Sequence, residues 1–270
     1  MSLAIAYSRG RSGINAPLVT VEVHISNGLP ALNLVGLPET AVKESKDRVR
    51  GAIINSHFQF PMQRITINLA PADVPKEGGR FDLPIALGIL AASGQISAIE
   101  LAKYECLGEL SLGGELRSVN GVLPVALQSR KANRALFLPL ENAQEAALVQ
   151  NVELFPAQHL LEICAHLNGQ QRLPTGINQT PAPSDDKSGL DFADVHGQFH
   201  VKRALEIAAT GLHNLLMLGP PGTGKSMLAS RLPSILPPLT EAQAIESAAI
   251  VSISDRRFDA ENWLGPPYRA

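Results

Sequence analysis

Residues 214–226 read Asn214-Leu215-Leu216-Met217-Leu218-Gly219-Pro220-Pro221-Gly222-Thr223-Gly224-Lys225-Ser226. Residues 214–218 are mainly apolar, as in a buried parallel strand, and residues 219–226 fit the spacing G-x-x-x-x-G-K-S that joins a strand to a helix. Glycines in such a loop let backbone N–H groups converge on phosphate oxygens at the positive end of the following helix. The stretch therefore predicts an α/β fold that binds a nucleoside triphosphate.

Two side chains of the loop have specific expected roles. Lys225 is expected to reach the β- and γ-phosphates as a mobile positive charge, and the Ser226 hydroxyl is expected to ligate the Mg²⁺ ion that bridges them. The expected binding residues are Gly219, Pro220, Pro221, Gly222, Thr223, Gly224, Lys225 and Ser226.

The composition indicates a soluble protein of about two domains. The chain has 270 residues, 45% of them hydrophobic, and a mean hydropathy of +0.06. No run approaches the roughly 18 apolar residues of a membrane span, and the N-terminus lacks a secretory signal, so we expect a cytoplasmic protein with no membrane contact. A net charge of −2 gives no global attraction to polyanions, so nucleic acid would need a local patch or a ring of subunits.

The two cysteines, Cys106 and Cys164, are too few for a disulfide framework. They also lack the CxxC or histidine spacing of a zinc site. We expect both to be ordinary buried thiols.

A domain boundary is predicted at residues 173–189, which are rich in Pro, Ser and Thr and poor in large apolar residues. Such a segment buries too little apolar surface to offset its ordering entropy. We therefore expect a flexible linker there, between a first domain of residues 1–172 and a nucleotide module of residues 190–270.

The first domain is predicted to be mixed α/β. Residues 19–25 and 65–69 alternate apolar and polar side chains as half-buried strands do, and residues 40–56 have helical spacing. Asp82 is expected to cap a helix over residues 83–92. The remaining expected elements are strands at 106–112 and 136–140 and helices at 122–130 and 160–167.

Two segments of this domain, residues 75–84 and 108–117, resemble parts of the Lon-type protease domain. The resemblance implies an α+β fold shared with a ribosomal-protein-like domain, and a Ser–Lys catalytic pair. Arg80 stands where the family has its serine and Leu123 where it has its lysine, which implies a non-catalytic relative. The serines nearby are expected to be turn or surface hydroxyls: Ser111 and Ser118.

The second domain resembles the magnesium-chelatase-like branch of AAA+ ATPases. The blocks that carry this resemblance, besides the loop, are residues 194–198, 204–216, 231–233 and 236–239. Residues 21–25 and 36–39 extend the resemblance over the whole chain to the ComM/YifB-like family of bacterial competence proteins.

The resemblance implies an ATP-driven ring, expected to be a homo-hexamer, that uses ATP and Mg²⁺. Such a ring would move branched or single-stranded DNA independently of sequence, as a branch-migration helicase that promotes DNA integration during natural transformation. By analogy residues 194–197 would pack near the adenine. Read from the residues alone, this segment is a helix-entry turn and His196 a structural histidine.

The chain departs from the family pattern after the loop. It ends at Ala270, and no apolar strand ending in Asp-Glu follows the loop. Asp255, Asp259 and Glu261 are interpreted as surface charge. We therefore expect the start of an AAA+ domain that binds nucleotide weakly and hydrolyses it poorly. In this domain, Pro233 is expected to end the helix that follows the loop. Residues 240–243 are expected to form a capping box for a helix that continues through residue 250.

DNA-contacting residues are not singled out by the sequence. Lys43, Lys46 and Arg50 share one helical face, with Arg48 nearby, but Glu44 and Asp47 interleave with them, which favours a self-paired face over a phosphate-binding strip. Aromatic residues are only 4% of the chain, so no stacking platform is evident. The loop candidates are Arg9, Arg11, Lys76 and Arg80.

Two classes of function remain open. A DNA-remodelling ATPase predicts ATP turnover stimulated by DNA, whereas a chelatase-like ATPase that remodels a protein or metallocofactor partner predicts turnover indifferent to DNA. A Lon-like peptidase is disfavoured by Arg80 and Leu123.

Overall fold

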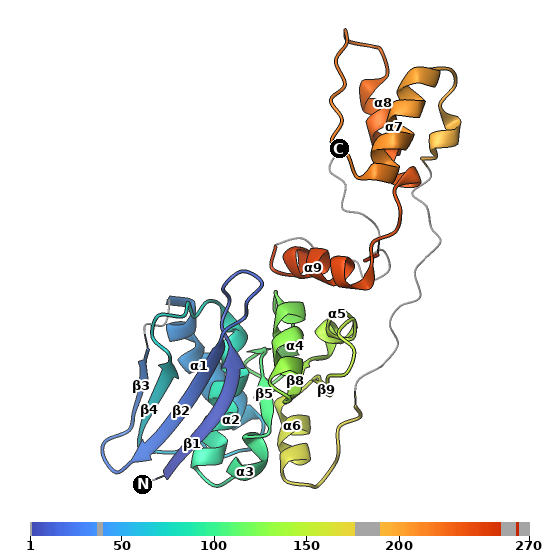
Figure 1. The fold of residues 1–270 in the computed structure, drawn as a ribbon. Helices are drawn as coiled ribbons and strands as arrows, with labels where there is room; N and C mark the ends of the chain where they lie inside the picture. The colour runs from blue at the N-terminus through green and yellow to red at the C-terminus, as the bar shows by residue number, and fades with distance from the viewer. Residues whose placement is uncertain (1, 37–39, 176–189, 255–262, 265–270) are drawn as a thin grey trace. The chain divides into compact units, whose positions relative to one another are not determined.

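The structure, a computed structural model, describes residues 2–36, 40–175, 190–254 and 263–264 (Figure 1). It divides into two compact units, one of Met1–Thr180 with Ala249–Phe258 and one of Pro181–Ala248 with Asp259–Ala270. The predicted domain limits at residues 172 and 190 stay predictions. Several predicted features lie outside the described residues: most of the linker (176–189), positions 37–39, and Asp255, Asp259 and Glu261.

The first unit is built on a mixed sheet with strand order β3-β4-β2-β1-β5-β8-β9. β2 runs antiparallel to β1 and β4, and the other neighbouring pairs of this sheet are parallel. The strands are β1 (Ser2–Arg9), β2 (Leu18–Ser26), β3 (Ala31–Val35), β4 (Arg64–Ala70), β5 (Tyr104–Cys106), β8 (Ala135–Pro139) and β9 (Leu154–Ala157), with a separate pair β6 (Glu109–Leu110) and β7 (Leu116–Arg117).

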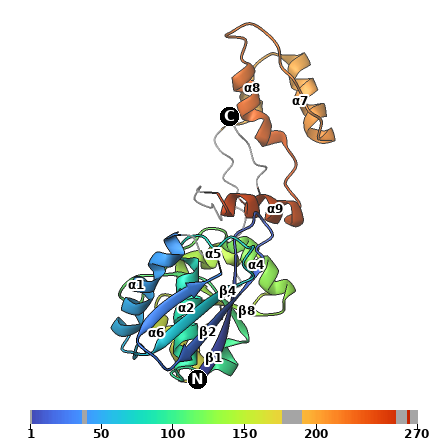
Figure 2. The same cartoon turned by 90° about the vertical axis from the view of Figure 1, so that its left-hand side faces the viewer.

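Helices join these strands. They are α1 (Thr40–Asn55), α2 (Asp82–Ala92), α3 (Ala98–Leu101), α4 (Val122–Lys131), α5 (Ala143–Ala146) and α6 (Leu160–Leu167), with 3-10 turns η1 (Gly79–Phe81) and η2 (Leu140–Asn142). α2 packs against β1 and β2, and α1 packs against α2 in turn (Figure 1 and Figure 2). The α/β class is therefore confirmed.

Hydrophobic periodicity located the elements that bury one face. β2 and β4 contain the predicted strands, with Val19, Val21, Val23 and Ile25 buried and the residues between them less so. α1, α4, β8 and α6 likewise match their predictions. The strand predicted at 106–112 is wrong in its extent, because the chain leaves the main sheet after Cys106 and forms only the short β6.

The role predicted for Asp82 is also wrong. Asp82 is the first residue of α2 and makes no cap, since its buried carboxylate accepts hydrogen bonds from Arg48 at 2.8 and 3.3 Å. Every residue of α2 is buried, so this helix lies inside the unit. Burial raises the pKa of Asp82 to about 6, although the Arg48 hydrogen bond opposes that shift.

An aromatic cluster fills the parallel half of the sheet. Tyr104 stacks on Phe137 with ring centroids 4.2 Å apart, and Phe155 and His166 contact both rings edge-on or tilted. The Tyr104 hydroxyl lies 2.9 Å from His166 Nε2. These contacts pack α6 against the neighbouring strands β5, β8 and β9.

The second unit contains η3 (Phe192–Asp194), α7 (Phe199–Gly211), α8 (Lys225–Arg231) and η4 (Leu232–Ile235), and α9 (Glu241–Ser252) begins in it. Its core is small: Phe192, Val195, Leu205 and Leu228, with four partly buried neighbours. Pro233 follows the end of α8, and Thr240 with Gln243 forms the reciprocal capping bonds predicted for α9. No helix in the described ranges is long and apolar enough to cross a membrane.

Substituting Gly36 with alanine is expected to destabilise the first unit by about 2–3 kcal/mol. Gly36 has φ +104°, and a Cβ there would lie 2.2 Å from Leu69 O on β4. Gly94→Ala is the matched control, because Gly94 has φ +74° but no atom within 4 Å of its Cβ position. Urea denaturation followed by circular dichroism would measure both, and equal losses would exclude the clash with Leu69.

Both cysteines are expected to resist thiol reagents in the native protein. Cys106 and Cys164 are buried, as predicted, and burial raises the pKa of both thiols, that of Cys164 to about 12. Because the thiolate is the reactive form, Ellman's reagent should react about a hundredfold more slowly than with the protein unfolded in guanidinium chloride. A fast native phase at either residue would show that its site opens locally.

Candidate phosphate-binding site

The loop of residues 219–224 connects an irregular segment to α8. Gly222 and Gly224 have φ of +86° and +84°, a backbone conformation that favours glycine. Gly224 is the N-cap of α8 and makes no side-chain capping bond, so glycine leaves the first turn of this helix uncovered. Two of the predicted glycines thus occupy positions that need them.

Lys225 folds back over the loop. Its Nζ donates to Gly219 O at 2.8 Å, Pro220 O at 2.7 Å and Thr223 Oγ1 at 3.3 Å. Thr223 Oγ1 in turn donates to Pro220 O at 2.9 Å. The structure therefore brings together four of the predicted residues around one ammonium group. Ser226 lies exposed on the first turn of α8.

The strand predicted before the loop is wrong. Residues 214–218 have no regular secondary structure, and Leu216 and Leu218 are 82% and 86% exposed. Met217 alone of these five packs against the small core of the unit. A strand needs a neighbouring strand to pair its backbone groups, and residues 190–254 contain none. The phosphate loop is thus present without the sheet edge expected to carry it.

Two other blocks of the nucleotide module meet at η3. Asp194 completes a capping box with Asp191, and its carboxylate lies 3.9 Å from Arg231 Nε at the end of α8. His196 is exposed, with Nδ1 2.8 Å from Asp194 O. This geometry fits the helix-entry turn and structural histidine that the residues alone suggested.

The two positions compared with a Ser–Lys pair lie in the first unit. Arg80 is buried and donates to Arg9 O at 3.4 Å and to Asn120 O, and burial lowers its pKa to about 10. Leu123 is fully buried on α4. A guanidinium that donates hydrogen bonds and an alkyl side chain supply neither a nucleophile nor a base. Ser111 is a turn hydroxyl that accepts from Glu115 N at 3.1 Å.

Three of the four loop cations that were considered as candidates for DNA contact are misplaced for that role. Arg9, Lys76 and Arg80 are buried, and Lys76 Nζ donates to Pro71 O. Arg11 is half-exposed and donates to Ile253 O at 2.6 Å. Burial is the property that loop position alone does not reveal.

The self-pairing predicted for the face of α1 stays a prediction, because the contacts that the structure gives its cations reach partners outside this helix. Arg48 binds Asp82, and the Arg50 guanidinium lies 5.3 Å from the Phe60 ring centre. Nothing is described for the side chain of Lys43.

A buried charge cluster escaped the sequence reasoning. Glu105 is fully buried on β5 and accepts from Arg9 Nε at 2.6 Å, Arg9 Nη2 at 2.7 Å and Ser129 Oγ at 2.6 Å. Arg134 Nη1 lies 3.6 Å from the same carboxylate. The one sequence signal that could have revealed this cluster is the position of Glu105 in a short strand, between Tyr104 and Cys106. Within the described part of the chain, no three His, Cys, Asp or Glu side chains group to hold a metal ion.

In a comparison with known families, two family models match the chain, and both describe the same subunit of one enzyme. Residues 21–142 match "Subunit ChlI of Mg-chelatase", and residues 191–270 match "Magnesium chelatase, subunit ChlI". The second match includes the whole phosphate loop. It begins close to the first described residue after the predicted linker.

Individual relatives match from end to end of the chain. The chain is 53% identical over 273 residues to competence protein ComM of Haemophilus influenzae. This alignment covers all of the chain and 54% of that relative. The chain is also 53% identical over 270 residues to the uncharacterised protein YifB of Salmonella typhimurium, covering all of the chain and 53% of the relative. An uncharacterised Mycobacterium bovis protein is 40% identical over 94% of the chain and 50% of its own length. The chain thus spans about half the length of the curated relatives it matches.

Proposed function

Because the chain is a ComM/YifB-like, magnesium-chelatase-like protein, we propose that it supplies the nucleotide-binding loop of an ATP-driven motor that remodels DNA. One observation carries the proposal: the Lys225 ammonium sits over a loop with two positive-φ glycines at the start of α8. That loop lies in the part of the chain that matches the magnesium chelatase subunit.

The loop residues fit a triphosphate with Mg²⁺. Backbone N–H groups around Gly222 and Gly224 are proposed to cradle phosphate oxygens, since no side chain caps the first turn of α8. Lys225 is proposed to exchange its bonds to two carbonyl oxygens for the β- and γ-phosphates, and Ser226 to ligate the metal. When bound, ATP with Mg²⁺ supplies the free energy of phosphoryl transfer.

The proposed motor is a branch-migration helicase that promotes DNA integration during natural transformation. The word competence belongs to the name of the H. influenzae relative, which matches the whole of this chain over 54% of its own length. We propose a homo-hexameric ring in which a neighbouring subunit contributes an arginine to the phosphate site, as AAA+ chemistry needs a cation at the transferred group.

The test is strand displacement on a synthetic four-way junction with ATP and Mg²⁺. ATP-dependent resolution by the complete parent protein, lost in its Lys225→Ala variant, is the expected result. ATP turnover without resolution of the junction would contradict the DNA motor. No turnover with any DNA would contradict the ATPase proposal itself.

A second candidate is an ATPase that remodels a protein or metallocofactor partner. The observation that favours it is that both family models describe a magnesium chelatase subunit. This candidate predicts ATP turnover that single-stranded and branched DNA leave unchanged, so one turnover assay with and without DNA separates the two.

A further inference from the structure

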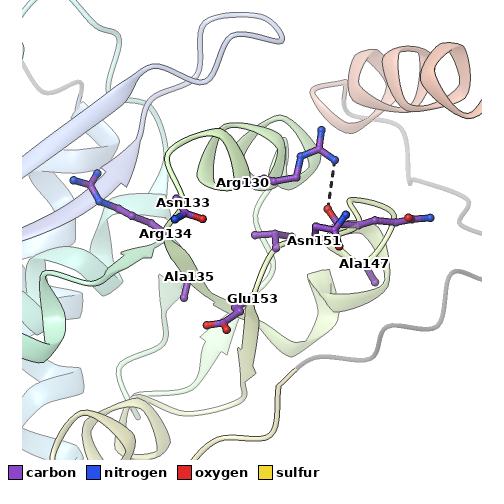
Figure 3. A pocket seen from close by; sticks show the side chains of 9 residues that line it. Arg130, Asn133, Arg134, Ala135, Ala147, Asn151 and Glu153 are labelled. Carbon is purple, nitrogen blue, oxygen red and sulfur yellow. Dashed lines mark hydrogen bonds between the residues drawn. The ribbon is translucent and has the colours of Figure 1, made fainter.

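A polar cleft of about 750 Å³ opens in the first unit at the amino-terminal ends of β8 and β9 (Figure 3). The last turn of α4 forms one wall through Arg130. The segment that follows α5 forms the other through Gln150, Asn151 and Glu153. Because β8 and β9 are parallel, both begin at this edge of the sheet and form the floor between the walls.

Two fixed turns shape the cleft. Asn133 has φ +54° and its N–H donates to Arg130 O at 3.1 Å, while Arg134 N donates to Ser129 O at 3.1 Å. The Arg134 side chain points away from the cleft and lies 3.9 Å from the Tyr7 ring centre (Figure 3). Asn151 holds a similar left-handed conformation, φ +58°, on the opposite wall. The cleft is therefore preorganised by backbone bonds and one anchored arginine.

Arg130 lines the cleft, and Lys131 follows it as the last residue of α4. Arg130 and Lys131 are exposed, and among the ion pairs between described residues neither has a carboxylate partner. Arg130 Nη1 donates to Gln150 O at 3.3 Å, which occupies one of its five N–H donors. Lys103 and Arg117, equally exposed cations of this unit, are instead 2.7 and 3.7 Å from glutamates.

The side chains that line the cleft indicate which class of ligand it can bind. Asn133, Gln150 and Asn151 present amide groups that hydrogen-bond to phosphate and sugar oxygens. The cleft has no aromatic side chain in its lining, so it offers no stacking surface for bases. Glu153 on the wall opposite Arg130 would repel phosphates and keep them on the α4 side.

We infer that this cleft binds the sugar–phosphate backbone of a DNA strand, with Arg130 and Lys131 contacting phosphates. The inference rests on the proposed DNA-remodelling function and gives it a sequence-independent contact in the first unit. It places that contact on α4 and the turns beside it, rather than on α1 or the loop cations considered from the sequence.

Fluorescence anisotropy with labelled oligothymidine and a labelled four-way junction tests the inference in the full chain. Arg130→Glu combined with Lys131→Glu should weaken binding about tenfold or more and reduce the slope of log K against log salt by about 2. Glu153→Gln should tighten binding about threefold by removing one repulsive charge. The charge-matched control is Lys103→Glu combined with Arg117→Glu, which should bind as the unmodified protein does.

Each outcome decides a different question. Equal binding by the unmodified protein and the Arg130/Lys131 variant would overturn the cleft while leaving the DNA motor standing. Equal weakening in the control pair would also overturn it, because net charge alone would explain the loss. No binding of either probe by the unmodified protein would overturn both the cleft and the proposed function. Circular dichroism of each variant establishes that it is folded.

Discussion

Replacing Lys225 with alanine is expected to lower ATP turnover by about a hundredfold or more. The variant loses the one cation that the loop itself places over its backbone, where it now bonds to Gly219 O and Pro220 O. The loop would then offer the phosphate oxygens N–H dipoles and no side-chain cation, so ATP affinity should fall together with turnover. Phosphate release under saturating ATP and calorimetric titration with ATP and Mg²⁺ measure the two effects.

The structure also predicts what this substitution leaves unchanged. The bonds that Lys225 makes lie in an exposed loop, so the free energy of unfolding should change by less than about 0.5 kcal/mol. Arg203→Ala is a suitable control, because Arg203 is a 73% exposed cation on α7 of the same unit. Unchanged turnover and ATP affinity in Lys225→Ala would refute the assignment of this loop as the nucleotide site.

Replacing Glu105 with alanine is expected to cost about 3–5 kcal/mol of folding free energy, the largest stability effect we predict. Glu105 is fully buried and joined to Arg9 by two bonds of 2.6 and 2.7 Å. Its removal would leave the Arg9 guanidinium, 8% exposed, without a counter-charge in the interior. Urea denaturation monitored by circular dichroism measures the loss.

A double substitution separates the unpaired buried charge from the loss of packing. Arg9→Met combined with Glu105→Leu removes both charges, so it should lose less stability than Glu105→Ala alone. Lys103→Ala, which breaks an exposed pair with Glu100, should cost at most about 1 kcal/mol. A loss below about 1 kcal/mol in Glu105→Ala would mean that water reaches the Arg9 site.

The fold was predictable where one face of an element is buried. β2 and β4 alternate because their outer faces meet solvent, and α1 shows its stripe through Val42, Val49 and Ile53. The prediction for Asp82 was wrong because α2 is buried on all sides, which the sequence around Asp82 does not show. An acidic residue at the start of a helix was therefore interpreted as a cap, although it forms a buried ion pair with Arg48. Residues 214–218 misled because a strand depends on neighbours that its own sequence does not contain.

The candidate sites could likewise be predicted only where their residues are close together in the sequence. The phosphate loop could be predicted because all its groups come from eight consecutive residues, so local spacing is enough to propose it. The polar cleft was missed because its walls come from two segments about twenty residues apart, which the pairing of β8 with β9 brings together. Arg9 and Arg80 remained candidates for DNA contact because their burial depends on packing that the sequence does not show.

The stacked rings of Tyr104 and Phe137 give the first unit a circular dichroism signal at shorter wavelength than the bands of tryptophan. Rings held 4.2 Å apart in a chiral environment produce near-ultraviolet circular dichroism, which disappears when β5 and β8 separate. The single tryptophan, Trp263, is 7% exposed and falls in the second unit, so its fluorescence follows a different part of the chain. One thermal scan with both signals therefore resolves whether the two units melt together or in sequence.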